Sequence, residues 1–191
     1  MIAAVVLAAG LARRMGRPKL LLPLGGRPLV RHAVERVRPH VDEVIVVTGP
    51  DDAGVRAALA DLDVRFVANP RPEEGQGSSI AAGVSALAPR TQAALVVLAD
   101  QPHVPSEIVP AVIAAWRRTR RPIVTPVYRG VPGPPVLFAA ALFDELRALA
   151  GDAGARPVVE AHPERVERVA VDAPVPADVD TPEDYARLHV E

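Results

Sequence analysis

Short apolar runs alternate along the chain with segments in which apolar residues recur every three or four positions. Runs rich in valine and isoleucine are typical of strands that are buried on both faces. Five such runs are Ile2–Ala8, Glu43–Thr48, Val64–Ala68, Ala93–Ala99 and Ile123–Tyr128. A later strand is predicted at Val166–Val171, and a closing helix from about Pro182.

Helical spacing fills the segments between these runs. The residues that share a helix face are Leu29, Ala33, Val34 and Val37, then Val55, Leu59 and Leu62, then Ile80, Val84 and Leu87, and then Ile108, Val112 and Trp116. This alternation predicts an α/β fold of three layers, α/β/α, around a mainly parallel sheet. Ligands of such sheets bind outside the C-terminal ends of the strands, so the loops there are the first candidates for function.

Composition narrows the classes of protein. The 191 residues suit one domain, 1–191, and the 3% aromatic content requires an aliphatic core. The absence of cysteine excludes disulfides, thiolate catalysis and Cys-ligated zinc, and a cytoplasmic location is expected. A formal net charge of -1 lacks the basic excess of nucleic-acid binders. The apolar start Met1–Gly10 is too short to span a membrane, so no membrane partner is expected.

A glycine-rich loop follows the first predicted strand, reading Ala8-Ala9-Gly10-Leu11-Ala12-Arg13-Arg14-Met15-Gly16-Arg17-Pro18-Lys19. Its two glycines allow the backbone N–H groups to approach a ligand closely. Arg14 and Lys19 add positive charge suited to the oxygens of a triphosphate. Judged on its residues alone, the loop fits a tight turn with solvated basic side chains better than a phosphate site. Since Lys19 is expected in a loop, its replacement should leave the fold intact.

The motif L-A-A-G-x-x-x-R-M-G-x-x-K-L-L-L-P resembles the signature of the nucleotidyltransferases with a Rossmann-like fold, of the nucleotide-diphospho-sugar transferase type. It is most similar to the branch that transfers CMP or GMP to the molybdenum cofactor, and especially to the molybdenum cofactor cytidylyltransferases. Further matches are Gly75-Gln76-Gly77-Ser78-Ser79, Leu98-Ala99-Asp100-Gln101-Pro102, Pro135-Val136-Leu137-Phe138, Gly151-Asp152-Ala153-Gly154-Ala155-Arg156 and Asp180-Thr181-Pro182-Glu183-Asp184. The resemblance implies catalytic roles for Arg14, Lys19 and Asp100.

The resemblance also implies the residues that bind the nucleotide, which are Leu7, Ala8, Ala9, Gly10, Arg14, Lys19, Asn69, Gln76, Ser78 and Asp100. For Ser78, N-capping of the next helix is the alternative. Arg156 is a candidate for the acceptor's phosphate, and a solvated arginine in a turn is its alternative. At Pro134 the chain departs from the His or Asn that the family often has there. Proline removes a donor, which puts acceptor contacts in that loop in doubt.

Two aspartates are candidate Mg²⁺ ligands. Asp100 ends a buried strand, where a carboxylate faces the ligand crevice, and Mg²⁺ typically takes one or two carboxylates together with phosphate oxygens. A turn or capping aspartate before Pro102 is the alternative. Asp180 precedes a helix start with Thr181 as N-cap and Pro182 at the first helical position. Thr181 can cap that helix while Asp180 points into the site.

The resemblance implies transfer of CMP from CTP to the terminal phosphate of molybdopterin carrying molybdenum, with a molybdoenzyme or its maturation factor as protein partner. The methyl group of Ala9 favours a pyrimidine, because relatives that transfer GMP tend to have glycine at this place. The alternatives are GTP with the same cofactor, a sugar phosphate as acceptor, and a carrier without catalytic activity. Intact Arg14, Lys19 and Asp100 argue against the carrier.

Overall fold

The computed structural model describes residues 1–10, 15–16 and 18–188. Its strands are β1 (Ile2–Ala8), β2 (Pro23–Leu24), β3 (Arg27–Pro28), β4 (Glu43–Thr48), β5 (Arg65–Ala68), β6 (Ala93–Leu98), β7 (Ile123–Tyr128), β8 (Val131–Pro132), β9 (Val136–Ala139) and β10 (Val166–Val171). Its α-helices are α1 (Leu29–Val37), α2 (Ala53–Ala58), α3 (Gln76–Ser85), α4 (Ile108–Thr119), α5 (Phe143–Arg147), α6 (Arg156–Ala161) and α7 (Pro182–Arg187). Short 3₁₀ helices are η1 (Lys19–Leu21), η2 (Arg38–His40), η3 (Pro72–Glu74), η4 (Ala140–Leu142) and η5 (Pro163–Arg165). None of the helices in these ranges has the length and apolar character needed to cross a membrane.

The main sheet has the strand order β10-β7-β9-β6-β1-β4-β5, with β8 paired to β7. Its strands run parallel except β9, which is antiparallel to both β6 and β7, and β8, which is antiparallel to β7. Each of the six predicted strands is present, and β1, β4, β7 and β10 have the predicted bounds. The mainly parallel sheet of the predicted α/β fold is therefore confirmed. Strand β9 is not among the predicted strands, because two prolines precede a run of only 4 residues.

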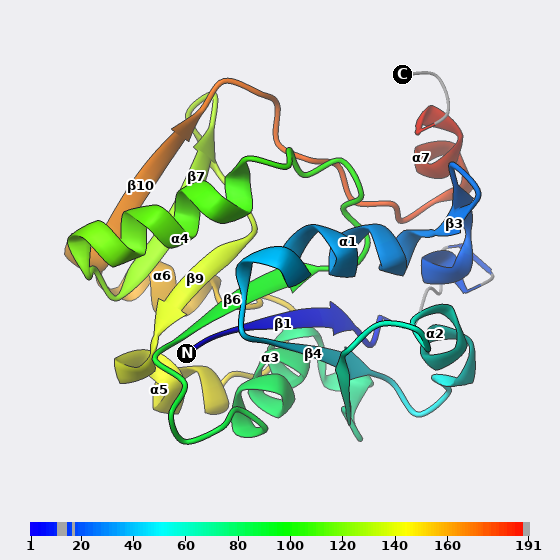
Figure 1. Cartoon of the computed structure of the whole chain (residues 1–191), viewed down its shortest axis with the longest axis horizontal. Helices are drawn as coiled ribbons and strands as arrows, with labels where there is room; N and C mark the ends of the chain where they lie inside the picture. The colour runs from blue at the N-terminus through cyan, green and yellow to red at the C-terminus, as the bar shows by residue number, and fades with distance from the viewer. Residues whose placement is uncertain (11–14, 17, 189–191) are drawn as a thin grey trace.

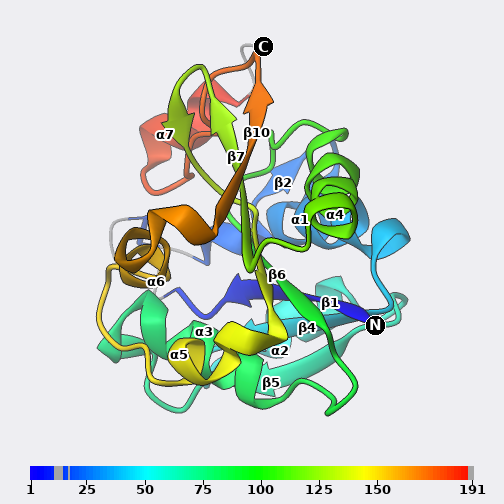
Figure 2. The same cartoon turned by 90° about the vertical axis from the view of Figure 1, so that its left-hand side faces the viewer.

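Helices cover both faces of this sheet (Figures 1 and 2). Alternating side chains of β1 divide between two hydrophobic cores, as the two-residue period of a strand requires. Ala4 and Val6 pack in the core that includes α1 and α4. Val5 packs in the core that includes α3 and α5. The predicted three-layer arrangement is confirmed, although the short helices α5 and α6, with 5 and 6 residues, show too few turns to be recognised by periodicity.

A small hairpin and the closing helix α7 lie together beyond the C-terminal end of β1 (Figure 1). Strands β2 and β3 are joined by Gly25 and Gly26, both with positive φ (55° and 78°), which a two-residue hairpin turn of this kind requires. A third hydrophobic cluster joins Leu22, which precedes the hairpin, to Val179, which precedes α7. The tyrosine hydroxyl of Tyr185 in α7 also donates to the carbonyl of Pro23. This packing brings the segment that follows the glycine-rich loop and the last helix, α7, to the same edge of the sheet.

We expect Gly83→Ala to destabilise the fold, although alanine is the better helix former. Gly83 is buried in α3, and a Cβ atom there would clash with Cγ1 of Val5 and lie 2.8 Å from Cγ2 of Val47. Both valines are fully buried in central strands, and their branched side chains have little freedom to move. The free energy of unfolding should fall by about 1–3 kcal/mol in chemical denaturation.

Gly54→Ala is the matched control, because it also replaces a helical glycine. The added Cβ there meets only a methyl group at the end of the Leu21 side chain, which can shift. This variant should be neutral or slightly more stable than the parent protein. Equal stability changes in the two variants would contradict the close packing of α3 on the sheet.

Candidate active site

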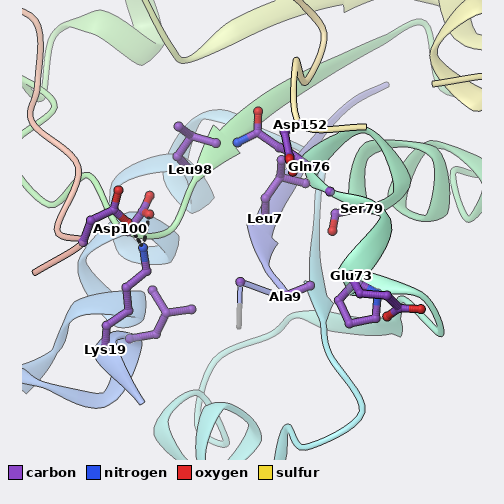
Figure 3. A pocket seen from close by; sticks show the side chains of 14 residues that line it. Leu7, Ala9, Lys19, Glu73, Gln76, Ser79, Leu98, Asp100 and Asp152 are labelled. Atoms are coloured by element: carbon purple, nitrogen blue, oxygen red, sulfur yellow. Dashed lines mark hydrogen bonds and ion pairs between the residues drawn. The ribbon is translucent and has the colours of Figure 1, made fainter. Parts of the chain in front are cut away.

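A cavity of about 610 Å³ opens where β1 and β6 end. Its wall comes from segments that are far apart in the sequence. The lining residues are Leu7, Ala9, Gly10, Lys19, Leu20, Pro72, Glu73, Gly75, Gln76, Ser79, Leu98, Asp100, Asp152 and Asp180. Figure 3 shows Lys19 and Asp100 at one end of the cavity and Gln76, Asp152 and Glu73 at the other, with Leu7 and Ala9 between them.

Lys19 joins two carboxylates at the first end of the cavity. Its Nζ lies 2.6 Å from Oδ2 of Asp100 and 2.7 Å from Oδ1 of Asp180. The lysine side chain is 9% exposed, and the two aspartate side chains are 21% and 29% exposed. Burial by itself would lower the pKa of Lys19, but the charges and hydrogen bonds of both aspartates outweigh it and raise that pKa. Lys19 is therefore a cation held by two partly buried carboxylates.

Apolar neighbours hold Lys19 in this position. It is the first residue of η1 and follows Pro18, whose φ is −62°. Leu20 is buried in the core that contains α1, and Leu22 is buried in the cluster near α7. The sequence had suggested a loop residue whose loss leaves the fold intact. The expectation that Lys19 lies in a loop was wrong, because Lys19 starts a short helix and its side chain is buried between two carboxylates.

Backbone contacts bring the two aspartates together. Asp100 lies two residues after the end of β6, and its carbonyl oxygen accepts a hydrogen bond from the N–H of Val179 at 3.1 Å. One residue further, Asp180 precedes α7, where Thr181 is the N-cap and forms a capping box with Asp184. The predicted helix start is confirmed, since Thr181 caps α7. Asp180 contacts Lys19 at the cavity, and its metal role stays a prediction.

The donors at this end suit a divalent cation that a nucleotide brings with it. One oxygen of Asp100 and one of Asp180 converge on the same ammonium group, so a positive charge already stands between them. No cluster of three or more His, Cys, Asp or Glu side chains suited to a metal occurs in the part of the chain that the structure describes. Mg²⁺ commonly binds one or two carboxylates and completes its shell with phosphate oxygens and water. The two aspartates fit that requirement.

The other end of the cavity is built from two interlocked glycine-rich segments. The N–H of Gly77 donates to the carbonyl of Gly151 at 2.8 Å, and the N–H of Gly151 donates to the carbonyl of Glu74 at 2.9 Å. Gly75, with φ of 91°, leaves no room for a Cβ, which would lie 2.5 Å from the carbonyl carbon of Gly151. This contact places Asp152 and the start of α3 on the same wall.

Seven of the predicted site residues line the cavity, namely Leu7, Ala9, Gly10, Lys19, Gln76, Asp100 and Asp180. Ala8 does not, because the alternation of β1 turns its side chain into the opposite core. Arg156 is exposed at the start of α6 and is not among the lining residues either. Arg14 lies outside the described residues. The binding roles given to all of these residues stay predictions.

Asn69 and Ser78 were expected to contact the nucleotide, but they organise the loop behind the cavity wall. The Asn69 amide donates to the hydroxyls of Ser78 and Ser79, and its oxygen accepts from the N–H of Arg71. Ser78 in turn bonds to the carbonyl of Gly75 at 2.8 Å. Both side chains use their polar atoms within the chain, and their direct contact with a nucleotide remains a prediction.

Ser79, Glu73 and Asp152 line the cavity and were not singled out from the sequence. A signal for Ser79 was available, because it falls on the buried face of α3 with Ile80 and Gly83, whereas Ser78 does not. Asp152 had no comparable signal, because it reaches the cavity through its packing against Gly75.

Comparison with known proteins shows similarity along almost the whole chain. Residues 4–166 match the MobA-like NTP transferase domain. The chain is 35% identical to the nicotine blue oxidoreductase of Paenarthrobacter nicotinovorans, over 96% of this chain and 94% of that protein. It is 30% identical to the purine catabolism protein PucB of Bacillus subtilis, over 95% and 92%. A probable molybdenum cofactor guanylyltransferase of Haloferax mediterranei is 32% identical over 56% of this chain and 51% of that protein.

Solved structures share the fold. Rv0371c from Mycobacterium tuberculosis superposes with a TM-score of 0.90 at 32% identity, covering 100% of this chain and 97% of that one. A complex of the same protein with manganese has a TM-score of 0.84 at 31% identity, covering 98% and 97%. The three relatives named in the preceding paragraph carry names that refer to different activities. The comparisons therefore support a shared domain and fold, but they do not identify one substrate.

We expect Lys19→Met to lower stability in the absence of ligands, because two carboxylates would then face each other without a cation. Since both are partly exposed to water, the loss in free energy of unfolding should be about 1–3 kcal/mol. Adding Mg²⁺ or Mn²⁺ should restore part of this loss, which thermal unfolding with and without metal will measure.

Arg27→Met is the control for Lys19→Met. Arg27 pairs with Glu35, but its side chain is 55% exposed, so the change should cost less than about 1 kcal/mol and should not respond to metal. If Lys19→Met were as stable as Arg27→Met and equally indifferent to metal, the two aspartates would not depend on Lys19 for their charge balance.

Proposed function

The chain belongs to the MobA-like NTP transferase family, and from this premise we propose that it transfers CMP from CTP to the terminal phosphate of a molybdopterin-type acceptor. The observation that carries the proposal is the cavity with Lys19, Asp100 and Asp180 at one end. We also propose that one domain, residues 1–191, performs the reaction. The relative named as a probable molybdenum cofactor guanylyltransferase supports this class of acceptor.

In the proposed reaction, an oxygen of the acceptor's phosphate monoester attacks the α-phosphorus of the nucleotide. A new P–O bond forms to the α-phosphorus, the bond between the α-phosphorus and its bridging oxygen to the β-phosphate breaks, and pyrophosphate leaves. The attacking oxygen is already ionised at neutral pH, so no general base has to remove a proton. The task of the protein is to align the two phosphates and to balance their charge.

Lys19 and the two aspartates would share this work. The Lys19 ammonium would move from the carboxylates to the triphosphate oxygens, where a fixed cation stabilises the charge on the departing pyrophosphate. Asp100 and Asp180, released from the lysine, would hold a divalent cation, which we propose to be Mg²⁺. When bound, that cation neutralises charge on the triphosphate. The manganese complex of Rv0371c supports a divalent cation in this family. Arg14 is proposed as a second clamp on the phosphates.

The remaining wall would hold the nucleoside. Leu7, Ala9 and Gly10 border the cavity beside the phosphate end, and Gln76 borders the far end with hydrogen-bonding groups suited to a base or ribose. The methyl group of Ala9 narrows the wall, which would crowd a purine more than a pyrimidine. This argument favours CTP, and GTP is the rival nucleotide. Arg156 and the exposed start of α6 are the proposed place for the acceptor's phosphate.

The rival functions are separable by one assay. Pyrophosphate release measured with each of the four nucleoside triphosphates, with and without molybdopterin, distinguishes the proposed enzyme from its alternatives. Release with CTP and molybdopterin supports the proposal. Pyrophosphate release with a sugar phosphate, and not with molybdopterin, would show that the acceptor is a sugar phosphate. Nucleotide binding without pyrophosphate release for any pair of substrates would favour a carrier without catalytic activity.

Asp100→Asn tests the proposed metal role, because it removes the charge and keeps the shape of the side chain. Mg²⁺-dependent binding of CTP, measured by calorimetry, should weaken at least tenfold, while CTP binding without metal should change little. Asp144→Asn, an exposed helical aspartate paired with Arg147, is the control and should leave both affinities unchanged. If CTP binding by Asp100→Asn depended on Mg²⁺ as it does in the parent protein, Asp100 would not bind the metal, and its role would be to pair with Lys19.

Ala9→Gly tests base selectivity. The parent protein should use CTP better than GTP, and the variant should narrow the ratio of the two kcat/KM values by relieving the crowding of the purine. One methyl group typically changes discrimination by on the order of tenfold, or about 1.4 kcal/mol. A preference of the parent protein for GTP would overturn CTP as substrate. A CTP preference that Ala9→Gly leaves untouched would place the selectivity elsewhere on the cavity wall.

A further inference from the structure

We propose that Gln101 is a positioning residue, which holds the segment before α7 so that Asp180 stays beside Asp100 and both can bind one divalent cation. The inference rests on the proposed metal role of the two aspartates, and it assigns a function to a buried side chain that does not line the cavity.

The amide of Gln101 reaches across to the segment that carries Asp180. Its side-chain nitrogen donates to the carbonyl of Pro176 at 3.2 Å and to Oδ1 of Asp178 at 2.8 Å. Gln101 is 4% exposed and its hydrogen bond to Pro176 is buried, whereas the bond to the exposed residue Asp178 is partly buried. Gln101 follows Asp100 directly. Two neighbouring residues therefore provide the Asp100 carboxylate and the amide that bonds to the segment carrying Asp180. We call this amide, with its two acceptors, the Gln101 clamp.

The orientation of this amide follows from its partners. Both groups that face the nitrogen are acceptors, a backbone carbonyl and a carboxylate, so the reversed amide would place three oxygens together. The amide oxygen, Oε1, has no hydrogen-bond partner among the described residues. The Gln101 residue also lines a small cavity of about 10 Å³ together with Arg36. The strength of the clamp therefore lies in the nitrogen and its two acceptors.

Other contacts keep the same segment folded without Gln101. The N–H of Val179 is bonded to the carbonyl of Asp100, and the Val179 side chain is buried with Leu22 and Leu29. The capping box at Thr181 holds the start of α7. Loss of the Gln101 amide should therefore shift the Asp180 carboxylate by a small distance and leave the fold in place. A small displacement is enough to weaken a metal site, since partners behind the ligands commonly contribute 10–100-fold to metal affinity.

Gln101→Met tests the proposal, because methionine keeps the length and bulk of the side chain and removes the amide. The readout is Mn²⁺ binding followed by electron paramagnetic resonance, with CTP present and the acceptor left out, so that no turnover is required. We expect Mn²⁺ to bind about tenfold more weakly than to the parent protein. CTP affinity without metal should not change. Thr91→Val, which alters another buried polar side chain whose hydroxyl has no partner among the described residues, is the control and should bind Mn²⁺ as the parent does.

A double-mutant cycle separates positioning from a general loss of structure. If Gln101 acts through Asp180, then Gln101→Met should weaken Mn²⁺ binding strongly in the parent protein and by less than about twofold in the Asp180→Asn background. Equal effects in both backgrounds would overturn the proposal, and so would parental Mn²⁺ affinity in Gln101→Met.

A second pair of variants carries the test if Gln101→Met does not fold. Asp178→Asn and Asp178→Ala both remove the charge, but only asparagine keeps an acceptor for the Gln101 amide. The alanine variant should bind Mn²⁺ several-fold more weakly than the asparagine variant, and equal affinities would contradict the clamp.

Each titration is repeated with GTP. Binding of Mn²⁺ by the parent protein with GTP and not with CTP would overturn the proposed nucleotide while leaving the test of Gln101 valid. No Mn²⁺ binding with either nucleotide would overturn the metal role of the aspartates and the positioning role together.

Discussion

Two carboxylates that face each other at the edge of the sheet need a cation between them, and much of the site is arranged around that need. In the structure the cation is the ammonium group of Lys19, within 2.7 Å of both Asp100 and Asp180. Without it, the repulsion between partly buried negative charges would oppose the packing of the segment before α7. In the proposed reaction, the same charge balance would let Lys19 and a divalent cation exchange places when a nucleotide binds. A divalent cation can take the position between the carboxylates only as Lys19 turns to other anions, and triphosphate oxygens are such anions.

Apolar packing and buried hydrogen bonds share the task of holding these three groups. Leucines on either side of Lys19 bury η1 in two different hydrophobic clusters, which places the lysine without fixing the end of its long side chain. The segment that carries Asp180 is held differently, through the hydrogen bond from the N–H of Val179 to the carbonyl of Asp100 and through the Gln101 amide, which donates to Pro176 and Asp178. The ammonium group stands at the end of a long side chain, whereas the carboxylates lie close to the backbone. In the proposed function, that difference suits a lysine that shifts to the triphosphate and two aspartates that bind a metal ion.

The two ends of the cavity differ in how they are built. The charged end depends on side chains whose chemistry few other residues could replace. The far end depends on backbone, because Gly75 and Gly77 lie against Gly151 and Ala150 too closely for any side chain. Gln76 and Asp152 extend from that frame and line the far end of the cavity.

The sequence by itself determined the elements whose signals are local. Long runs of valine and isoleucine mark the buried strands, and Thr181-Pro182 marks the start of the last helix, because each pattern reports its own segment's burial or capping. Lys19 and Asp100 were recognisable through the resemblance of their motifs to a known family, because their local patterns alone fitted turns and caps as well. Only the tertiary structure decided what depends on distant partners. It paired β9 between β6 and β7, turned Ser79 to the cavity and Ser78 away, placed Asp152 beside Gly75, and joined Gln101 to Asp178. In each of these cases the deciding contact is with a residue on another element, and a one-dimensional pattern carries no information about which segments will meet.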